Sequence, residues 1–200
     1  MIPIFEGKQA TYNKAILETL LTEGPMSAWQ LAKGITPKIP SVQRTASSTE
    51  TQKIYSVLMR KDGRLDNLKS NEYINLSGDN QKWEIAVKGM IAICIEKPQL
   101  KALINLEYWN KHVIGEVKMP KEKMEIPLVG ITIDGKVWGK HLSNLLNKLK
   151  SGNMSVVDRI LGDAKKLLEE GVNLDKISTK SLMILLSGKA MKNHNIGPFF

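Results

Sequence analysis

The sequence predicts a mainly helical protein that contains one small β-hairpin and divides into two domains. Several stretches place apolar residues at i, i+3, i+4 and i+7, the spacing that gives a helix one core-directed face. Two of these stretches open with the S-x-x-E or S-x-x-Q spacing of a helix capping box. Two runs of alternating apolar residues flank the turn-forming letters GDNQ, which predicts a β-hairpin. We expect a first domain over residues 1–97 and a helical C-terminal domain over residues 98–200.

Composition places the chain among folded, well-packed proteins. Its 200 residues are 42% hydrophobic and 24% charged, as in ordinary globular domains. No apolar run approaches the length of a membrane span, and the first residues lack the pattern of a secretory signal. We therefore expect a cytoplasmic protein with no membrane partner. Cys94 is the only cysteine and stands in the apolar run MIAICI, so we expect a buried thiol and no disulfide.

The net charge of +9 favours a polyanionic partner, most simply nucleic acid. Residues 1–97 contain 13 basic and 10 acidic side chains, and residues 98–200 contain 16 and 10. The basic excess is therefore spread along the chain and is larger in the second half. A high lysine content that serves solubility is the alternative interpretation.

Two helices are predicted near the N-terminus. The first covers residues 11–22, and the second opens at Ser27, where Gln30 completes a capping box. Gly34 is expected to mark the end of the second helix. Trp29 stands in its first turn, and packing is the expected fate of a single tryptophan there.

A third helix is predicted over residues 47–63, with Ser47 and Glu50 as its capping box and Gly63 as a left-handed closing residue. Its apolar stripe consists of Ile54, Val57, Leu58 and Lys61. Its opposite face consists of Thr49, Gln52, Lys53, Ser56 and Arg60. Such side chains can reach phosphates and base edges, and no carboxylate stands among them. An ordinary solvated face is equally compatible with this pattern.

The hairpin is predicted from strands at residues 73–77 and 82–87, with Ile74 and Leu76 directed inward. A helix over residues 90–96 follows, and a further helix from residue 99 to about 112 is expected to bury Leu100, Leu103 and Ile104.

The C-terminal half is expected to be helical after a loop at residues 113–130. A helix from residue 134 to 149 is favoured, while a hairpin that turns at Asp134-Gly135 is the competing interpretation. Two further helices are predicted at residues 155–170 and 175–186.

The predicted order of helix, helix, helix, β-hairpin and helix resembles the winged helix-turn-helix domain of bacterial and archaeal transcription regulators. The matching segments are SAWQLAKGI for the second helix, TETQKIYSVLMRKDGRL for the recognition helix, and EYINLSGDNQKWEIAVKGMIAI for the wing and following helix. The resemblance covers about half of the chain. It departs from the family at residues 36–46, where two prolines stand in a connection that is usually a short turn.

The resemblance implies sequence-specific binding of double-stranded DNA by a transcription regulator, with the recognition helix in the major groove and the wing beside it. Gln52 and Ser56 would contact base edges, while basic residues and the wing tip would contact phosphates. Lys38 and Arg44 of the connection are further candidates for DNA contacts. The full candidate set is Arg44, Ser48, Thr49, Gln52, Lys53, Ser56, Arg60, Asn80 and Lys82. A winged-helix module that docks on proteins without contacting DNA is the alternative.

Nothing in the sequence has the pattern of a catalytic or metal site. His112, His141 and His194 stand far apart, one cysteine cannot form a zinc finger, and the glycines form no phosphate loop. We therefore expect no enzyme activity, no cofactor and no metal. The C-terminal helices are expected to form a homodimer; a small-molecule effector site, a partner-docking domain and packing within one chain are the alternatives.

Overall fold

The fold is described from a computed structural model. It describes residues 2–40, 48–77, 81–104, 124–126, 131–133, 147, 154–179, 181–183 and 185–186. The chain forms two compact units, residues 1–104 and residues 105–200, which are considered separately. The described part is mainly helical and contains two small antiparallel sheets, in agreement with the mainly helical fold expected. Residues 98–104 belong to the first unit rather than the second.

The first unit opens with five helical segments. These are η1 (Pro3–Phe5), η2 (Gly7–Gln9), α1 (Ala10–Glu23), α2 (Ala28–Ile35) and η3 (Thr36–Lys38). The predicted capping box of α2 is present: the Gln30 backbone N–H donates to Ser27 Oγ at 3.3 Å, and the Ser27 N–H donates to Gln30 Oε1 at 2.9 Å. Gly34 does not end α2 as expected. It lies within the helix, where the absence of a side chain lets α1 approach through Thr19.

α3 (Ser48–Met59) forms where the third helix was predicted, and α4 (Arg64–Ser70) follows it. The prediction that Gly63 is left-handed was wrong, because Gly63 has a φ of −80° and the left-handed residue is Asp62, with a φ of 56°. Glycine is needed at 63 for another reason. A Cβ there would lie 2.4 Å from the carbonyl oxygen of Arg60, so only glycine fits this tight connection. Ser47, the expected cap, lies outside the described residues.

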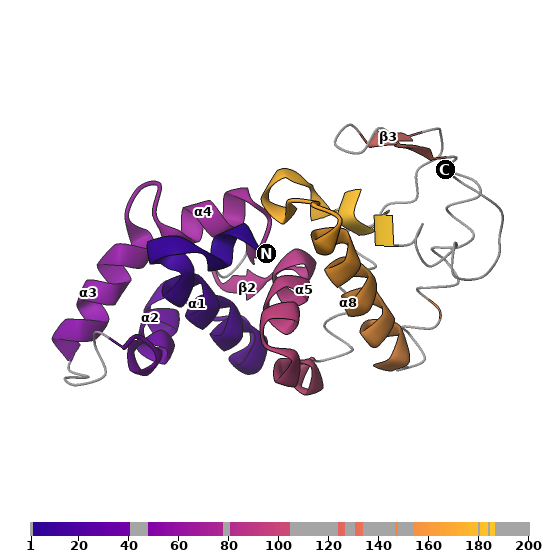
Figure 1. The fold of residues 1–200 in the computed structure, drawn as a ribbon. Helices are drawn as coiled ribbons and strands as arrows, with labels where there is room; N and C mark the ends of the chain where they lie inside the picture. The colour runs from indigo at the N-terminus through magenta and orange to yellow at the C-terminus, as the bar shows by residue number, and fades with distance from the viewer. Residues whose placement is uncertain are drawn as a thin grey trace. The chain divides into compact units, whose positions relative to one another are not determined.

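α4 was not predicted, because its segment carries only two apolar residues. Leu65 and Leu68 are spaced by three and both are buried, which is enough to hold a short helix against α1 and β1. The order in the first unit is therefore four α-helices, a hairpin and a fifth helix. Figure 1 shows α2 beside both α1 and α3, and these two pairs are in contact.

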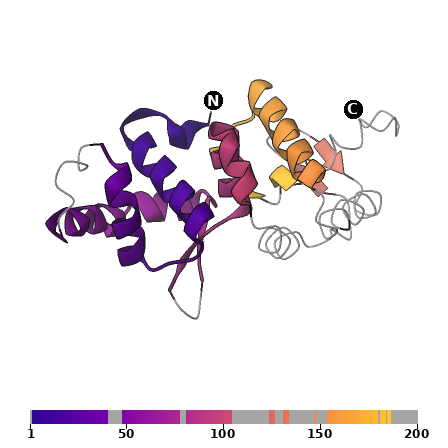
Figure 2. The ribbon, with the colours of Figure 1, turned by 90° about the horizontal axis from the view of Figure 1, so that it is seen from below.

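The predicted hairpin is present as β1 (Ile74–Leu76) and β2 (Trp83–Ile85), paired antiparallel with Ile74 opposite Ile85 and Leu76 opposite Trp83. Figure 2 shows the two strands side by side, extending away from the helices. Trp83 also bonds to Met26 through N–H···O contacts of 3.0 and 2.8 Å. Leu76 was expected to point inward but is 37% exposed, because it lies toward the hairpin tip while Ile74 lies over the core.

α5 (Val87–Glu96) starts three residues earlier than predicted and packs against α1. Gly89 lies in its first turn, where a Cβ would be 2.1 Å from the carbonyl oxygen of Tyr73. The α-helix expected from residue 99 is instead a 3-10 helix, η4 (Pro98–Leu103). Leu100 is buried in this segment, but Leu103, its last residue, is 52% exposed, which corrects the prediction that Leu103 is buried.

Cys94 is buried in α5, as the sequence predicts. Burial raises the pKa of its thiol to about 12, because a thiolate loses its hydration in an apolar environment. The thiol is therefore protonated at neutral pH and unreactive toward alkylating reagents.

The second unit contains a short sheet and a long helix in its described part. β3 (Met124–Ile126) pairs antiparallel with β4 (Ile131–Ile133), so the loop expected at residues 113–130 contains a strand. α8 (Met154–Glu169) confirms the helix predicted at residues 155–170, and its apolar stripe is buried. The predicted helix at residues 134–149 and the C-terminal tail lie outside the described residues, apart from helical residue 147. Of the competing hairpin that turns at Asp134-Gly135, only residues 131–133 are described, and they form β4, which pairs with β3.

The last helix predicted begins later than expected. Asp175 lies in η5 (Leu174–Lys176), a 3-10 helix. Ser178 then accepts a hydrogen bond from the Ser181 N–H at 3.1 Å, the contact of a helix N-cap. The apolar residues predicted for this segment are nevertheless buried: Ile177, Leu182, Leu185 and Leu186.

Candidate functional site

α3 is fixed to the first unit by its inner face. Ile54 and Leu58 are buried as predicted, and α2 is the helix that α3 contacts most. Thr51 lies on the same face, and its hydroxyl oxygen is 3.4 Å from the hydroxyl oxygen of Thr36 in η3. Lys61, the last member of the predicted stripe, is exposed, because α3 ends before it. The inner face thus sets which side chains of α3 point to solvent.

The outer face of α3 carries the predicted polar residues, and all of the following are exposed: Thr49, Gln52, Lys53, Ser56 and Arg60. Lys53 forms an ion pair of 3.1 Å with Glu50, one turn earlier. The Ser56 hydroxyl donates to the Gln52 carbonyl at 2.9 Å. The Gln52 side chain is exposed, so its amide faces solvent. This face presents hydrogen-bonding groups and cations together.

Arg60 stands just beyond α3, with Lys61 beside it, and both are exposed. Within the described part of the chain, Arg60 takes part in no ion pair. Its guanidinium is therefore better placed than the Lys53 ammonium to meet an outside anion, because Lys53 already has Glu50 as a partner.

Of the remaining candidate residues, the structure describes Lys82 fully and Ser48 in part. Lys82 is exposed at the start of β2, where its N–H donates to Ser77 Oγ at 3.3 Å and its carbonyl accepts from the Ser77 N–H at 2.9 Å. Arg44 and Asn80 lie outside the described residues, and Ser48 is placed in α3 only by its backbone.

An exposed apolar patch, which the sequence did not predict, lies beside the polar face. Trp29 of α2 is 48% exposed and Met59 at the end of α3 is 47% exposed. Tyr55 connects them: its ring meets that of Trp29 edge to face, with centroids 5.6 Å apart, and Met59 stands one turn after it. Trp29, Tyr55 and Met59 are called the apolar patch below. Only the tertiary packing of α2 on α3 could have located it.

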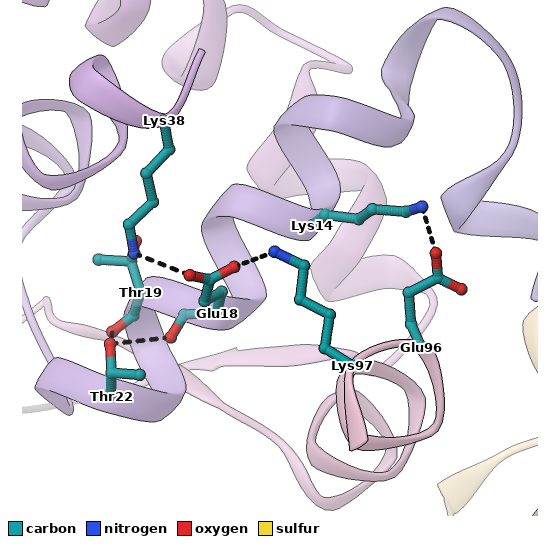
Figure 3. Close-up of polar contacts among 7 residues, drawn as sticks. All are labelled: Lys14, Glu18, Thr19, Thr22, Lys38, Glu96 and Lys97. Carbon is teal, nitrogen blue, oxygen red and sulfur yellow. Dashed lines mark hydrogen bonds and ion pairs between the residues drawn. The ribbon is translucent and has the colours of Figure 1, made fainter. Parts of the chain in front are cut away.

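A half-buried ionic cluster holds the segment that leads toward α3. Glu18 of α1 accepts a hydrogen bond from Lys97 and pairs with Lys38 of η3 at 3.6 Å. Lys38 also donates to the Thr19 hydroxyl at 2.9 Å, and Lys14 pairs with Glu96 nearby. Figure 3 shows Lys38 and Lys97 approaching the Glu18 carboxylate from opposite sides. Lys38, a candidate for DNA contact, is therefore engaged within the fold.

The cluster changes the pKa of Glu18. Burial alone raises the pKa of this carboxyl, but the Lys97 hydrogen bond and the charges of Lys38 and Lys97 outweigh that effect and lower the pKa below its usual value. The ionised carboxylate is therefore the form that the folded state favours, and it links α1 to both η3 and the end of α5.

The part of the chain that the structure describes contains neither a metal-binding cluster nor a membrane-spanning helix. No group of three or more His, Cys, Asp or Glu side chains there could hold a metal ion. None of the helices among those residues combines the length and the hydrophobicity needed to cross a bilayer. The three histidines lie outside the described residues.

Comparison with known proteins adds no further information about the site. No protein-family model, curated protein or solved structure matches the chain. The function proposed below therefore rests on the residues of the site itself.

Proposed function

We propose that the protein binds double-stranded DNA in a sequence-specific manner, with the outer face of α3 in the major groove, and acts as a cytoplasmic transcription regulator. The observation that carries the proposal is the combination on α3 of a buried inner face and an exposed outer face with Gln52, Ser56 and Arg60. Side chains of these types recognise base edges and phosphates.

Two features of the first unit and the net charge of the whole chain support this proposal. α3 packs on α2 and the chain then leads into a β-hairpin, which is the order that resembles a winged helix-turn-helix domain. The hairpin extends away from the helices (Figure 2), as a wing must in order to reach a neighbouring part of the duplex. The net charge of +9 attracts polyanions.

The unpredicted α4 is a departure from the order on which the resemblance was based, because it separates α3 from the hairpin. α4 is seven residues long and exposes Asp66, Asn67 and Lys69. α3 is longer and carries no exposed carboxylate between Thr49 and Arg60 on its outer face. Since DNA repels carboxylates, α3 is the better candidate for the recognition helix.

Protein docking without DNA contact is the second candidate function, and the apolar patch is the observation that favours it. Exposed aromatic and methionine side chains are enriched at protein interfaces. In that case the polar face of α3 would be a solvated rim, and the basic excess would serve solubility.

The second unit is proposed to form a homodimer, because one recognition module offers little DNA area and a two-fold pair doubles it. The stripe of α8 is already buried within the chain. The dimer proposal therefore depends on the helix predicted at residues 134–149, which lies outside the described residues apart from residue 147.

The test of the proposed function is a titration of labelled random-sequence duplex with the full chain at two ionic strengths. Binding at low salt that weakens steeply at higher salt is expected, because neutralised phosphates release condensed counterions. A poly-glutamate competitor controls for nonspecific attraction to polyanions and should displace little bound duplex. No binding even at low salt would contradict the proposal and would favour protein docking.

A further inference from the structure

The apolar patch adjoins the groups proposed to contact bases. Tyr55 stands three residues after Gln52, and Met59 stands three residues after Ser56, so each pair lies side by side on the α3 surface. Met59 is also seven residues after Gln52, which returns it to nearly the same side of the helix. A surface that approaches DNA through Gln52 and Ser56 therefore brings Met59 toward the same duplex.

The spacing along α3 sets which part of the duplex Met59 would meet. Seven residues at 1.5 Å per residue separate Gln52 from Met59 by about 10 Å along the helix axis. Base pairs are spaced by about 3.4 Å along each strand. Where α3 follows the groove, Met59 lies about three base pairs from the pair that Gln52 contacts.

The chemistry of the major groove gives an exposed apolar side chain one complementary group. Beside the hydrogen-bond donors and acceptors of the base edges, the C5-methyl of thymine is the one methyl group that projects into the groove. Met59 has a flexible, polarisable side chain that adapts to such a group. Tyr55, held by its edge-to-face contact with Trp29, supports Met59 from one side.

We propose that Met59 contacts the C5-methyl of a thymine, so that the DNA site contains an A·T pair about three base pairs from the pair that Gln52 reads. This inference rests on the proposed DNA-binding function and names its sequence preference. Charge argues for DNA as the occupant of the apolar patch. Arg60 and Lys61, both exposed, directly follow Met59 in the chain, against the single exposed carboxylate of Asp62 in the same turn, which suits a polyanion with methyl groups.

Replacement of thymine by deoxyuridine tests this contact, since it removes the methyl group and keeps the base pairing. The probe is a duplex recovered by selection from a random-sequence library, with each thymine replaced in turn. For the wild-type chain, one replacement should weaken binding about fourfold, equivalent to the ~0.8 kcal/mol of burying one methyl-sized group. Met59→Gln keeps the length of the side chain and its helix propensity, and it should abolish the difference between the two duplexes.

Leu103→Gln is the matched control, because Leu103 is an equally exposed apolar residue on η4 rather than α3; it should retain the fourfold difference. The inference is overturned when no deoxyuridine weakens wild-type binding, when Met59→Gln keeps the same difference, or when selection enriches no thymine-containing site. In each of those cases the chain still binds duplex. Failure of the wild-type chain to bind any duplex at low salt overturns the proposed function itself.

Discussion

Gln52→Ala and Arg60→Ala should change DNA binding in different ways, because a base contact carries sequence information and a phosphate contact does not. Gln52 is exposed in the N-terminal half of α3, and a glutamine can form two hydrogen bonds with adenine in the major groove. Loss of such a pair should cost about 1–3 kcal/mol at one base pair. Gln52→Ala should therefore relax the preference at one position and leave binding to random duplex nearly unchanged.

Arg60→Ala should instead weaken binding to all duplexes alike. Each lost phosphate contact lowers the slope of log affinity against log salt by about 0.9. Lys53→Ala should weaken binding in the same way but less, because Lys53 is paired with Glu50 at 3.1 Å and DNA must compete with that carboxylate. Arg60 has no such competitor among the described residues.

These substitutions should leave the fold intact, since all three sites are exposed and an i,i+3 ion pair contributes only about 0.2–0.5 kcal/mol. The assay combines binding-site selection, anisotropy titrations at several salt concentrations and circular dichroism. Lys8→Ala is the matched control, because Lys8 is an exposed cation on η2, beside α1. Unchanged selection and affinity in folded Gln52→Ala and Arg60→Ala would refute the role of α3 as the recognition helix. Protein docking would then be the better-supported function.

Three other predictions concern stability and assembly. Ile54→Ala or Leu58→Ala should destabilise the first unit by roughly 2–5 kcal/mol, since both side chains are buried; equal urea midpoints for variant and wild type would contradict this. Glu18→Gln should cost about 1 kcal/mol at neutral pH. The pKa of Glu18 is lowered from 4.5 in the folded state, so the difference in unfolding free energy between wild type and Glu18→Gln should shrink as the pH falls through the folded pKa. Urea titrations at several pH values measure this difference, with Glu6→Gln as the control. Light scattering at tens of micromolar should give the mass of a homodimer, and a monomer would remove the dimer proposal.

Local signals predicted the elements that define α3 and its support. The capping box at Ser27 is local in sequence and was confirmed. Ile54 and Leu58 could be assigned to the core from helical spacing alone, because a buried stripe must repeat every three or four residues. The exposed polar face of α3 follows from the same spacing.

Features that depend on tertiary packing could not be predicted. α4 needs only Leu65 and Leu68 because α1 and β1 cover them. Gly63 is required by the approach of the Arg60 carbonyl, which no local pattern encodes. The exposure of Trp29 was also missed, since a tryptophan in a helix usually packs and only the position of Tyr55 explains its orientation.

The central claim, that α3 lies in the major groove, is tested most directly by cleavage of DNA from a reagent attached to α3. Lys61→Cys introduces a thiol at an exposed residue just beyond α3, and Cys94 should not react because it is buried with a pKa of about 12. An iron-chelate cleavage reagent at position 61 should cut the selected duplex within a few base pairs of its centre of recognition. The same reagent on Lys8→Cys, on η2, should give only background cutting. Full binding by the labelled Lys61→Cys protein with no cutting above that background would contradict a position of α3 in the major groove.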